Sequence, residues 1–193
     1  MKKYSFANSE WECDFDYTYS LVANTYNKFT YADGQVFSGY NEERGVYDYV
    51  SVAHKDVFHS GAKVSVECSF DKFGAPLITI ANSIYTDSDG KSMYGDHYEV
   101  VSYKDGCNIW YITKAQEGSA KPFVNIKCLS VHFPIEEGSR LNLSVKVVGK
   151  LLCVELNGVR FDYLADKLAE NFRLGITGCE GVNRFYCAEI SQD

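Results

Sequence analysis

The sequence predicts an all-β fold, a two-sheet antiparallel β-sandwich. Short apolar runs bounded by Gly, Asp and Asn recur along nearly the whole chain, as they do in antiparallel sheets. A helical composition occurs in one stretch, residues 164–171. The chain has 193 residues, of which 46% are hydrophobic and 23% charged, so we expect a single folded domain over residues 1–193.

The expected strands follow one another from residue 46 to residue 190. In each of them, apolar, β-branched and aromatic residues gather between turn residues. The first 35 residues are rich in Tyr and predict an N-terminal strand and loops. The strands are expected at residues 46–53, 62–70, 76–83, 97–103, 107–114, 122–132, 140–148, 151–156, 159–163, 172–177 and 184–190.

The hairpin between residues 97 and 114 is expected to turn at Asp105 and Gly106. A two-residue turn there predicts four cross-strand pairs: Tyr103–Asn108, Val101–Trp110, Glu99–Ile112 and His97–Lys114. One face of this hairpin then belongs to the core, with Tyr98, Val100, Ile109 and Tyr111. The other face surrounds the indole of Trp110 with hydrogen-bonding groups, from His97, Glu99, Tyr103, Asn108 and Lys114.

Two tight turns determine the expected register between residues 140 and 163. Asn157 and Gly158 suit a type I′ turn, because both of its central residues need a positive φ. A second turn at Gly149 and Lys150 adds a third strand. Both turns place the apolar residues on one face, through the pairs Leu156–Val159, Val154–Phe161, Leu152–Tyr163, Val147–Leu152, Val145–Val154 and Leu143–Leu156.

Three stretches resemble a known family. LNLSVKVVGKLLCVELNGVRFDY at residues 141–163 and FRLGITGCEGVNRFYCAEI at residues 172–190 are similar to the closing strands of concanavalin A-like lectin and glucanase domains. YVSVAHKDVFHSGAKVSVECSF at residues 49–70 resembles an earlier strand pair of these domains. The resemblance covers residues 46–190 and implies a jelly roll. Lectins, laminin-G-like modules and glycan hydrolases share this fold, so it implies fold rather than activity.

The composition disfavours two classes of partner. With 26 acidic and 19 basic residues the net charge is −7, which on average repels a nucleic-acid backbone. The apolar runs fall well short of the roughly 20 residues that cross a bilayer, and none behind Met1 resembles a signal peptide. We therefore expect no nucleic-acid partner, no membrane span and a cytoplasmic location. The seven cysteines form no CxxC pair, which predicts free thiols and no zinc site.

The face around Trp110 predicts a carbohydrate site. An aromatic ring covers the C–H side of a sugar while amide, carboxylate and ammonium groups bind its hydroxyls. We therefore expect a non-catalytic, lectin-like module that binds an oligo- or polysaccharide. One alternative is a glycan-acting hydrolase, for which His97 and Glu99 are the candidate acid and base. A second alternative is a structural or assembly module whose exposed aromatic residues contact another protein.

Two further motifs are only partly matched by the sequence. Laminarinase-like enzymes carry Glu-x-Asp-x-x-Glu on one strand, and the nearest stretch, which starts at Glu12, has Tyr17 in place of the second Glu. The acidic residues Glu10, Glu12, Asp14 and Asp16 are instead expected on one solvated edge. We expect no cofactor. If a metal ion is bound, calcium is the candidate, with Asp87, Asp89 and Asp96 as its ligands. The sequence there favours an ordinary acidic turn instead.

Overall fold

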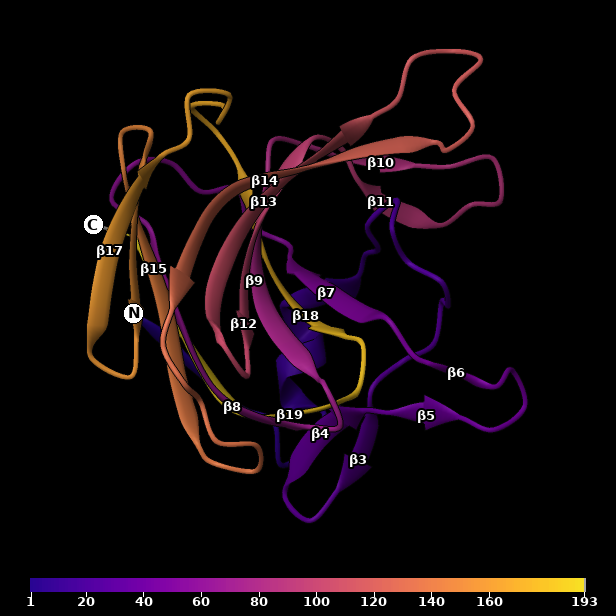
Figure 1. The fold of residues 1–193 in the computed structure, drawn as a ribbon, viewed down its shortest axis with the longest axis vertical. Helices are drawn as coiled ribbons and strands as arrows, with labels where there is room; N and C mark the ends of the chain where they lie inside the picture. Colours follow the sequence, from indigo (N-terminus) through magenta and orange to yellow (C-terminus); the bar gives the residue numbers. More distant parts are fainter. Residues whose placement is uncertain (193) are drawn as a thin grey trace.

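Two large antiparallel sheets make up the protein. The computed structural model describes residues 1–192. In spatial order the eight-stranded sheet contains β17 (Val159–Leu164), β16 (Leu151–Leu156), β15 (Leu141–Val148), β8 (Lys63–Asp71), β19 (Val182–Ser191), β4 (Gln35–Ser38) and β3 (Thr30–Ala32), with β1 (Lys2–Ser5) paired to β19. The seven-stranded sheet contains β14 (Phe123–His132), β13 (Gly106–Lys114), β12 (His97–Tyr103), β9 (Ala75–Ala81), β18 (Arg173–Cys179), β7 (Val50–His54) and β2 (Phe15–Tyr17). Figure 1 shows the arrangement of the two sheets and labels most of these strands.

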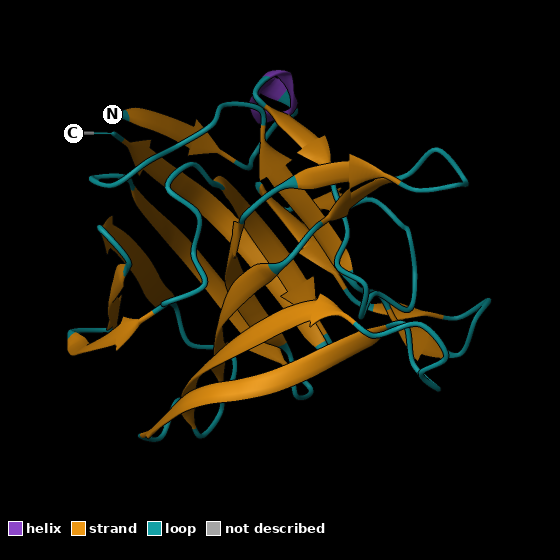
Figure 2. Cartoon of the chain, turned by 90° about the horizontal axis from the view of Figure 1, so that it is seen from above, coloured by secondary structure: helices purple, strands orange, loops and turns teal. Residues whose placement is uncertain are grey.

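Smaller elements lie outside the two sheets. Two ribbons project from them, β5 (Tyr40–Asn41) with β6 (Val46–Tyr47) and β10 (Ile84–Thr86) with β11 (Ser92–Tyr94). The helical content of the described chain is one 3-10 helix, η1 (Glu10–Cys13), which Figure 2 shows at one edge of the fold. None of the helical structure in residues 1–192 has the length and apolar character that a bilayer crossing needs.

The core fills the space between the two sheets. On β15 every second residue is buried, from Leu141 to Val147, and the residues between them are exposed or half-buried. On β12, Tyr98 and Val100 belong to the same buried cluster. This alternation is what one buried face of each sheet requires. The prediction of an all-β, two-sheet antiparallel sandwich is confirmed.

The predicted register of the β15–β16–β17 meander is confirmed at every pair. Val154 lies opposite Val145 and Phe161, and Leu152 lies opposite Val147 and Tyr163. Asn157 and Gly158 both have positive φ, 50° and 84°, as a type I′ turn requires. The turn residues alone were therefore sufficient to align three strands.

The predicted register of the β12–β13 hairpin is wrong by two residues. The turn lies at Lys104 and Asp105, Tyr103 pairs with Gly106, and Glu99 rather than Val101 lies opposite Trp110. Gly106 is not a turn residue but lies where β14 approaches closely. A Cβ at this position would lie 2.0 Å from the carbonyl oxygen of Val131, so only glycine fits. A shift of two residues keeps each side chain on its predicted face.

The helical composition of residues 164–171 does not produce a helix, because Leu164 ends β17 and the residues after it form an irregular connection. Ala165 and Leu168 are buried in the core, and the backbone N–H of Ala165 bonds to the carbonyl of Lys150. The side-chain oxygen of Asn82 accepts a hydrogen bond from the N–H of Ala169. Tertiary contacts therefore replace the hydrogen bonds that a helix would have formed.

The predicted strand 46–53 is divided into β6 and β7. Between them, Asp48 donates its N–H to the carbonyl of Gly39, and Tyr49 donates its N–H to the hydroxyl of Thr25. This break releases Tyr49 from the sheet ladder and lets its side chain reach the outer face of the seven-stranded sheet. The N-terminal 35 residues form β1, η1, β2, β3 and the loops between them.

Candidate functional site

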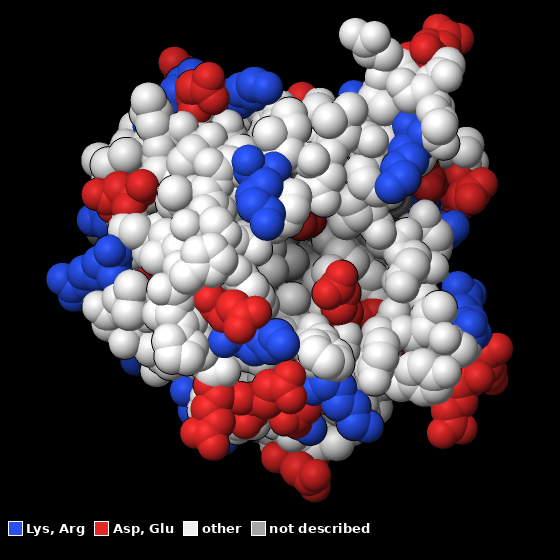
Figure 3. Space-filling view, in the orientation of Figure 1, with Lys and Arg blue, Asp and Glu red and all other residues white. Residues whose placement is uncertain are grey.

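A cleft of about 460 Å³ lies on the outer face of the seven-stranded sheet, opposite the core. Its volume is within the range of small-molecule sites, about 300–1,000 Å³. Figure 3 shows a hollow near the centre of this face, bordered by both acidic and basic side chains. The residues that line the cleft are Val22, Asn24, Tyr49, Phe73, Gly74, Ala75, Leu77, Glu99, Val101, Tyr103, Lys104, Asn108, Trp110, Asn125, Cys179 and Glu180.

The strands β12 and β13 supply the aromatic and amide groups of the cleft. Trp110 is half-buried, and the ammonium of Lys127 on β14 lies over its ring, 4.9 Å from the centroid. This cation–π contact holds the indole next to the edge strand β14. Asn108, on the same face, accepts a hydrogen bond from the hydroxyl of Ser130 through its side-chain oxygen. Its amide NH2 therefore remains as the donor for a ligand.

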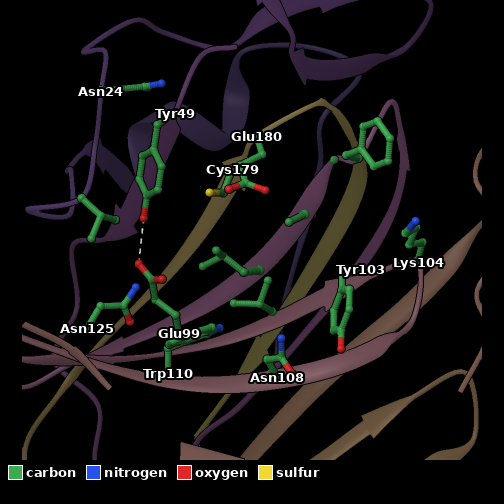
Figure 4. Close-up of a pocket in the computed structure, with 16 residues that line it drawn as sticks. Asn24, Tyr49, Glu99, Tyr103, Lys104, Asn108, Trp110, Asn125, Cys179 and Glu180 are labelled. Carbon is green, nitrogen blue, oxygen red and sulfur yellow. Dashed lines mark hydrogen bonds between the residues drawn. The ribbon is translucent and has the colours of Figure 1, made fainter. Parts of the chain in front are cut away.

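Glu99 is the one acidic side chain in the described chain that is buried, with 5% of its surface exposed. The hydroxyl of Tyr49 donates to its Oε1 over 2.7 Å, and Figure 4 shows the two groups facing each other at one end of the cleft. Burial and the neighbouring carboxylate raise the pKa of the Tyr49 phenol well above its usual range. Tyr49 therefore stays protonated as a hydrogen-bond donor to Glu99.

His97 lies beside Glu99 but does not line the cleft. Its Nδ1 is 2.6 Å from the carbonyl oxygen of Gly95, which can only accept, so Nδ1 carries a proton. Its Nε2 is 3.0 Å from the hydroxyl of Ser20 and 3.3 Å from Oε1 of Glu99. Nε2 thus faces two oxygen atoms, and His97 and Glu99 are in direct contact beneath the cleft.

Residues 18–28 explain why His97 is buried, because this segment crosses the outer face of the sheet. Its polar residues Thr18, Ser20 and Thr25 are buried against the strands. Thr18 donates its N–H to the carbonyl of Ser51, and Ser20 contacts His97. The segment thus covers part of this face and leaves the cleft open beside it.

Cys179 lines the same cleft as a protonated thiol. Burial, and then the Glu99 carboxylate, raise its pKa well above the usual range. A thiol held in this state is a poor nucleophile at neutral pH. The seven cysteines of the protein are free thiols in the structure, as the sequence predicts.

Four of the six predicted ligand-binding residues meet in the cleft, namely Glu99, Tyr103, Asn108 and Trp110. The remaining two are His97, which is covered, and the exposed Lys114, which lines a second cavity together with Asp96. Sequence reasoning missed the cleft residues Tyr49, Phe73, Lys104, Asn125 and Glu180. These residues come from strands and turns that only the tertiary fold brings together.

The carboxylates considered for calcium do not come together. Oδ1 of Asp87 accepts hydrogen bonds from the N–H groups of Asp89 and Lys91 within its own turn. Asp96 accepts hydrogen bonds from Tyr111 and Thr113. Across residues 1–192, no three His, Cys, Asp or Glu side chains are grouped closely enough to hold a metal ion.

Near the N-terminus, Glu10, Glu12 and Asp16 are exposed as the sequence predicts, but η1 interrupts the strand pattern that would align the four carboxylates on one edge. Glu12 lies on η1 and accepts a hydrogen bond from Tyr31. Asp14 pairs with Lys2 at 3.2 Å and accepts a hydrogen bond from Tyr4. These two contacts lower the pKa of Asp14.

Comparison with known proteins identifies the fold. No protein-family model and no curated protein matches the sequence. A solved structure from human gut bacteria, described with endo-acting O-glycanases that initiate mucin breakdown, is 14% identical over 100% of this chain and 99% of its own, with a TM-score of 0.65. The carbohydrate-binding module CBM66 from Bacillus subtilis is 11% identical over 93% and 96% of the two chains, with a TM-score of 0.60. The protein has a concanavalin A-like jelly-roll fold.

A third neighbour shares this jelly roll. It is a family 16 glycoside hydrolase, an endo-glucanase from Bacteroides ovatus, 9% identical over 98% of this chain and 99% of its own, with a TM-score of 0.63. The expected fold is therefore correct. The described functions of the three neighbours include both binding and cleavage of carbohydrate, and identities this low establish the fold alone.

Proposed function

We propose that the protein binds an oligo- or polysaccharide in the cleft of the seven-stranded sheet and does not cleave it. The observation that carries this proposal is the composition of the cleft around Trp110. A half-buried indole lies between a buried carboxylate, Glu99, and a free amide donor, Asn108. An aromatic surface beside such groups complements the apolar face and the hydroxyls of a sugar ring.

Two features favour binding over catalysis. His97 is fully buried and makes its contacts to Ser20, Gly95 and Glu99, so it faces no ligand in the cleft. The thiol of Cys179 is protonated. The jelly-roll neighbours include a carbohydrate-binding module, which gives this function a precedent on the same fold.

The test is a glycan array probed with the purified protein, followed by calorimetric titration of the strongest glycan. Trp110→Ala should weaken binding about tenfold to hundredfold, because roughly 1.5 to 3 kcal/mol of apolar contact is lost. The fold should remain intact, since Trp110 faces away from the core. Tyr40→Ala is the matched control, because Tyr40 is an exposed aromatic residue on the β5–β6 ribbon and does not line the cleft.

An array without any bound glycan would contradict the proposal. So would a Trp110→Ala variant that binds as tightly as the wild type.

A second candidate function is a glycan-acting enzyme, which the burial of Glu99 favours. A buried carboxylate on a cleft floor is a frequent feature of acid–base sites, and Glu180 offers a second carboxylate on the rim. Incubation of the array-positive polysaccharide with the protein should then release new chain ends, and Glu99→Gln should abolish their release while the glycan still binds. Equal release by wild type and Glu99→Gln would assign the activity to a contaminant or to other residues.

A further inference from the structure

The turn between β8 and β9 holds an aromatic residue in an unfavourable backbone conformation. Lys72 and Phe73 are its two central residues, with φ of 51° and 65°, and Gly74 donates its N–H to the carbonyl of Asp71 over 2.9 Å. Such turns favour Asn and Gly, because the side chains of other residues crowd the backbone in the left-handed region. The residues of this turn are therefore not those that would stabilise it most.

Phe73 also contributes little to the packing of the fold. Its side chain is 68% exposed. The one ring contact found for it in the described structure is with the ammonium of Lys104, 5.3 Å from the ring centroid. An exposed phenyl ring gains almost none of the burial energy that stabilises a core residue. Neither the turn nor the core therefore explains a Phe at this position.

The surrounding backbone holds the turn in place. Glu137 accepts a hydrogen bond from the N–H of Phe73 over 3.1 Å. A Cβ on Gly74 would lie 2.3 Å from the carbonyl oxygen of Val182, and one on Gly181 would lie 2.1 Å from the nitrogen of Gly74. The β8–β9 turn thus packs backbone to backbone against the β18–β19 turn. Phe73 is consequently presented on a rigid support.

Phe73 lies at the end of the cleft away from Trp110. Trp110 pairs with Glu99 near the start of β12, whereas Lys104, which contacts Phe73, follows Tyr103 at the end of β12. Figure 4 shows Glu99 and Trp110 at one end of the cleft and Tyr103 and Lys104 at the other. Glu99 and Tyr103 are four positions apart on β12, a distance of about 13 Å along the strand. This separation exceeds the width of one sugar ring.

We propose that Phe73 is a second aromatic platform of the cleft, and that the ligand is a chain of at least two linked sugar rings reaching from Trp110 to Phe73. This inference rests on the proposed carbohydrate-binding function. The left-handed turn keeps the phenyl ring out of the core and exposed at the cleft. Its backbone strain is retained because the ring contacts ligand.

The first experiment varies the length of the ligand. The polysaccharide with the strongest array signal is cut into chains of one, two, four and six rings, and each is titrated into wild type, Phe73→Ala and Trp110→Ala. Phe73→Ala should weaken binding of the four-ring and six-ring chains about tenfold and leave the single ring unchanged. Trp110→Ala should weaken binding at every length. Equal affinities of wild type and Phe73→Ala for the long chains would overturn the platform while leaving the proposed function standing.

The second experiment separates the ligand contact from the stability of the turn. The double variant Lys72→Asn, Phe73→Gly places the preferred residues in the type I′ turn. Its Tm should rise by about 2 to 4 °C, and its affinity for the long chains should fall as it does for Phe73→Ala. A lower Tm would show that Phe73 serves the fold and would overturn the inference. If the wild type bound no glycan on the array, the proposed function would be contradicted, and the role of Phe73 as an aromatic platform would be contradicted with it.

Discussion

Adjacent residues on β16 have opposite environments, and this makes the register of the meander testable by mutation. Val154 is 2% exposed and faces the core, whereas Glu155 faces solvent and pairs with Arg160 at 2.9 Å. Val154→Asp should unfold the domain, because it buries an unpaired carboxylate. Glu155→Ala should cost at most about 1 kcal/mol, as expected for an exposed ion pair. Urea denaturation monitored by circular dichroism measures both changes, and a larger loss for Glu155→Ala would contradict the register.

Glu99 illustrates what the sequence can and cannot predict about one residue. Strand alternation places it with Trp110 on the outer face, and the structure agrees because the register error of two residues preserves this alternation. Its burial could not be predicted in this way. It depends on Tyr49, which precedes Glu99 by 50 residues and whose hydroxyl reaches it across the sheet.

At the scale of elements, the local chemistry of a turn determines whether it can be predicted. Asn157 and Gly158 both adopt a positive φ at the centre of their turn, so the Asn-Gly pattern predicts this hairpin correctly. The similar Asp105-Gly106 pattern misleads, because Gly106 serves the close approach of β14 rather than the turn. The Lys72-Phe73 turn carries no Gly or Asn at its centre and therefore gives no sequence signal.

Helical propensity fails at residues 164–171 for a similar reason. The segment has a helix-favouring composition, yet Ala165 and Leu168 are required by the core, and Asn82 satisfies the backbone N–H of Ala169. Propensity differences amount to fractions of a kcal/mol per residue, whereas burial of a Leu side chain contributes about 1.5 to 3 kcal/mol. Burial therefore determines the conformation of this connection.

For the whole molecule, the cleft is a product of topology. The residues that line it extend from Val22, near one end of the chain, to Glu180, near the other. Sequence reasoning identified the part that lies on one hairpin, where strand alternation applies. The remaining part, including the covering segment at residues 18–28, depends on which strands neighbour β12 in the sheet. That order follows from long-range pairing rather than from local pattern.

The buried thiols and phenols also give the whole molecule a defined response to alkaline pH. Burial raises the pKa of Cys68 and of Cys107 from 9.0 to about 12. Above pH 9 the unfolded chain loses these protons while the folded protein retains them. The free energy of unfolding should therefore be constant with respect to these groups below pH 9 and fall as the pH rises toward 12. Each group contributes a slope of up to about 1.4 kcal/mol per pH unit.

The contribution of the two thiols can be isolated by comparing pH dependences rather than absolute stabilities. Urea unfolding in the presence of reductant is measured from pH 7 to pH 11 for the wild type and for the double variant Cys68→Ala, Cys107→Ala. The variant loses stability at every pH, because each substitution leaves a cavity. Between pH 9 and pH 10, however, its free energy of unfolding should fall less steeply than that of the wild type. Buried tyrosines such as Tyr49, whose ordinary pKa is 10.0, are present in both proteins and contribute equally to the two curves. Parallel curves for the two proteins between pH 9 and pH 10 would mean that the two thiols ionise as easily in the folded protein as in the unfolded chain.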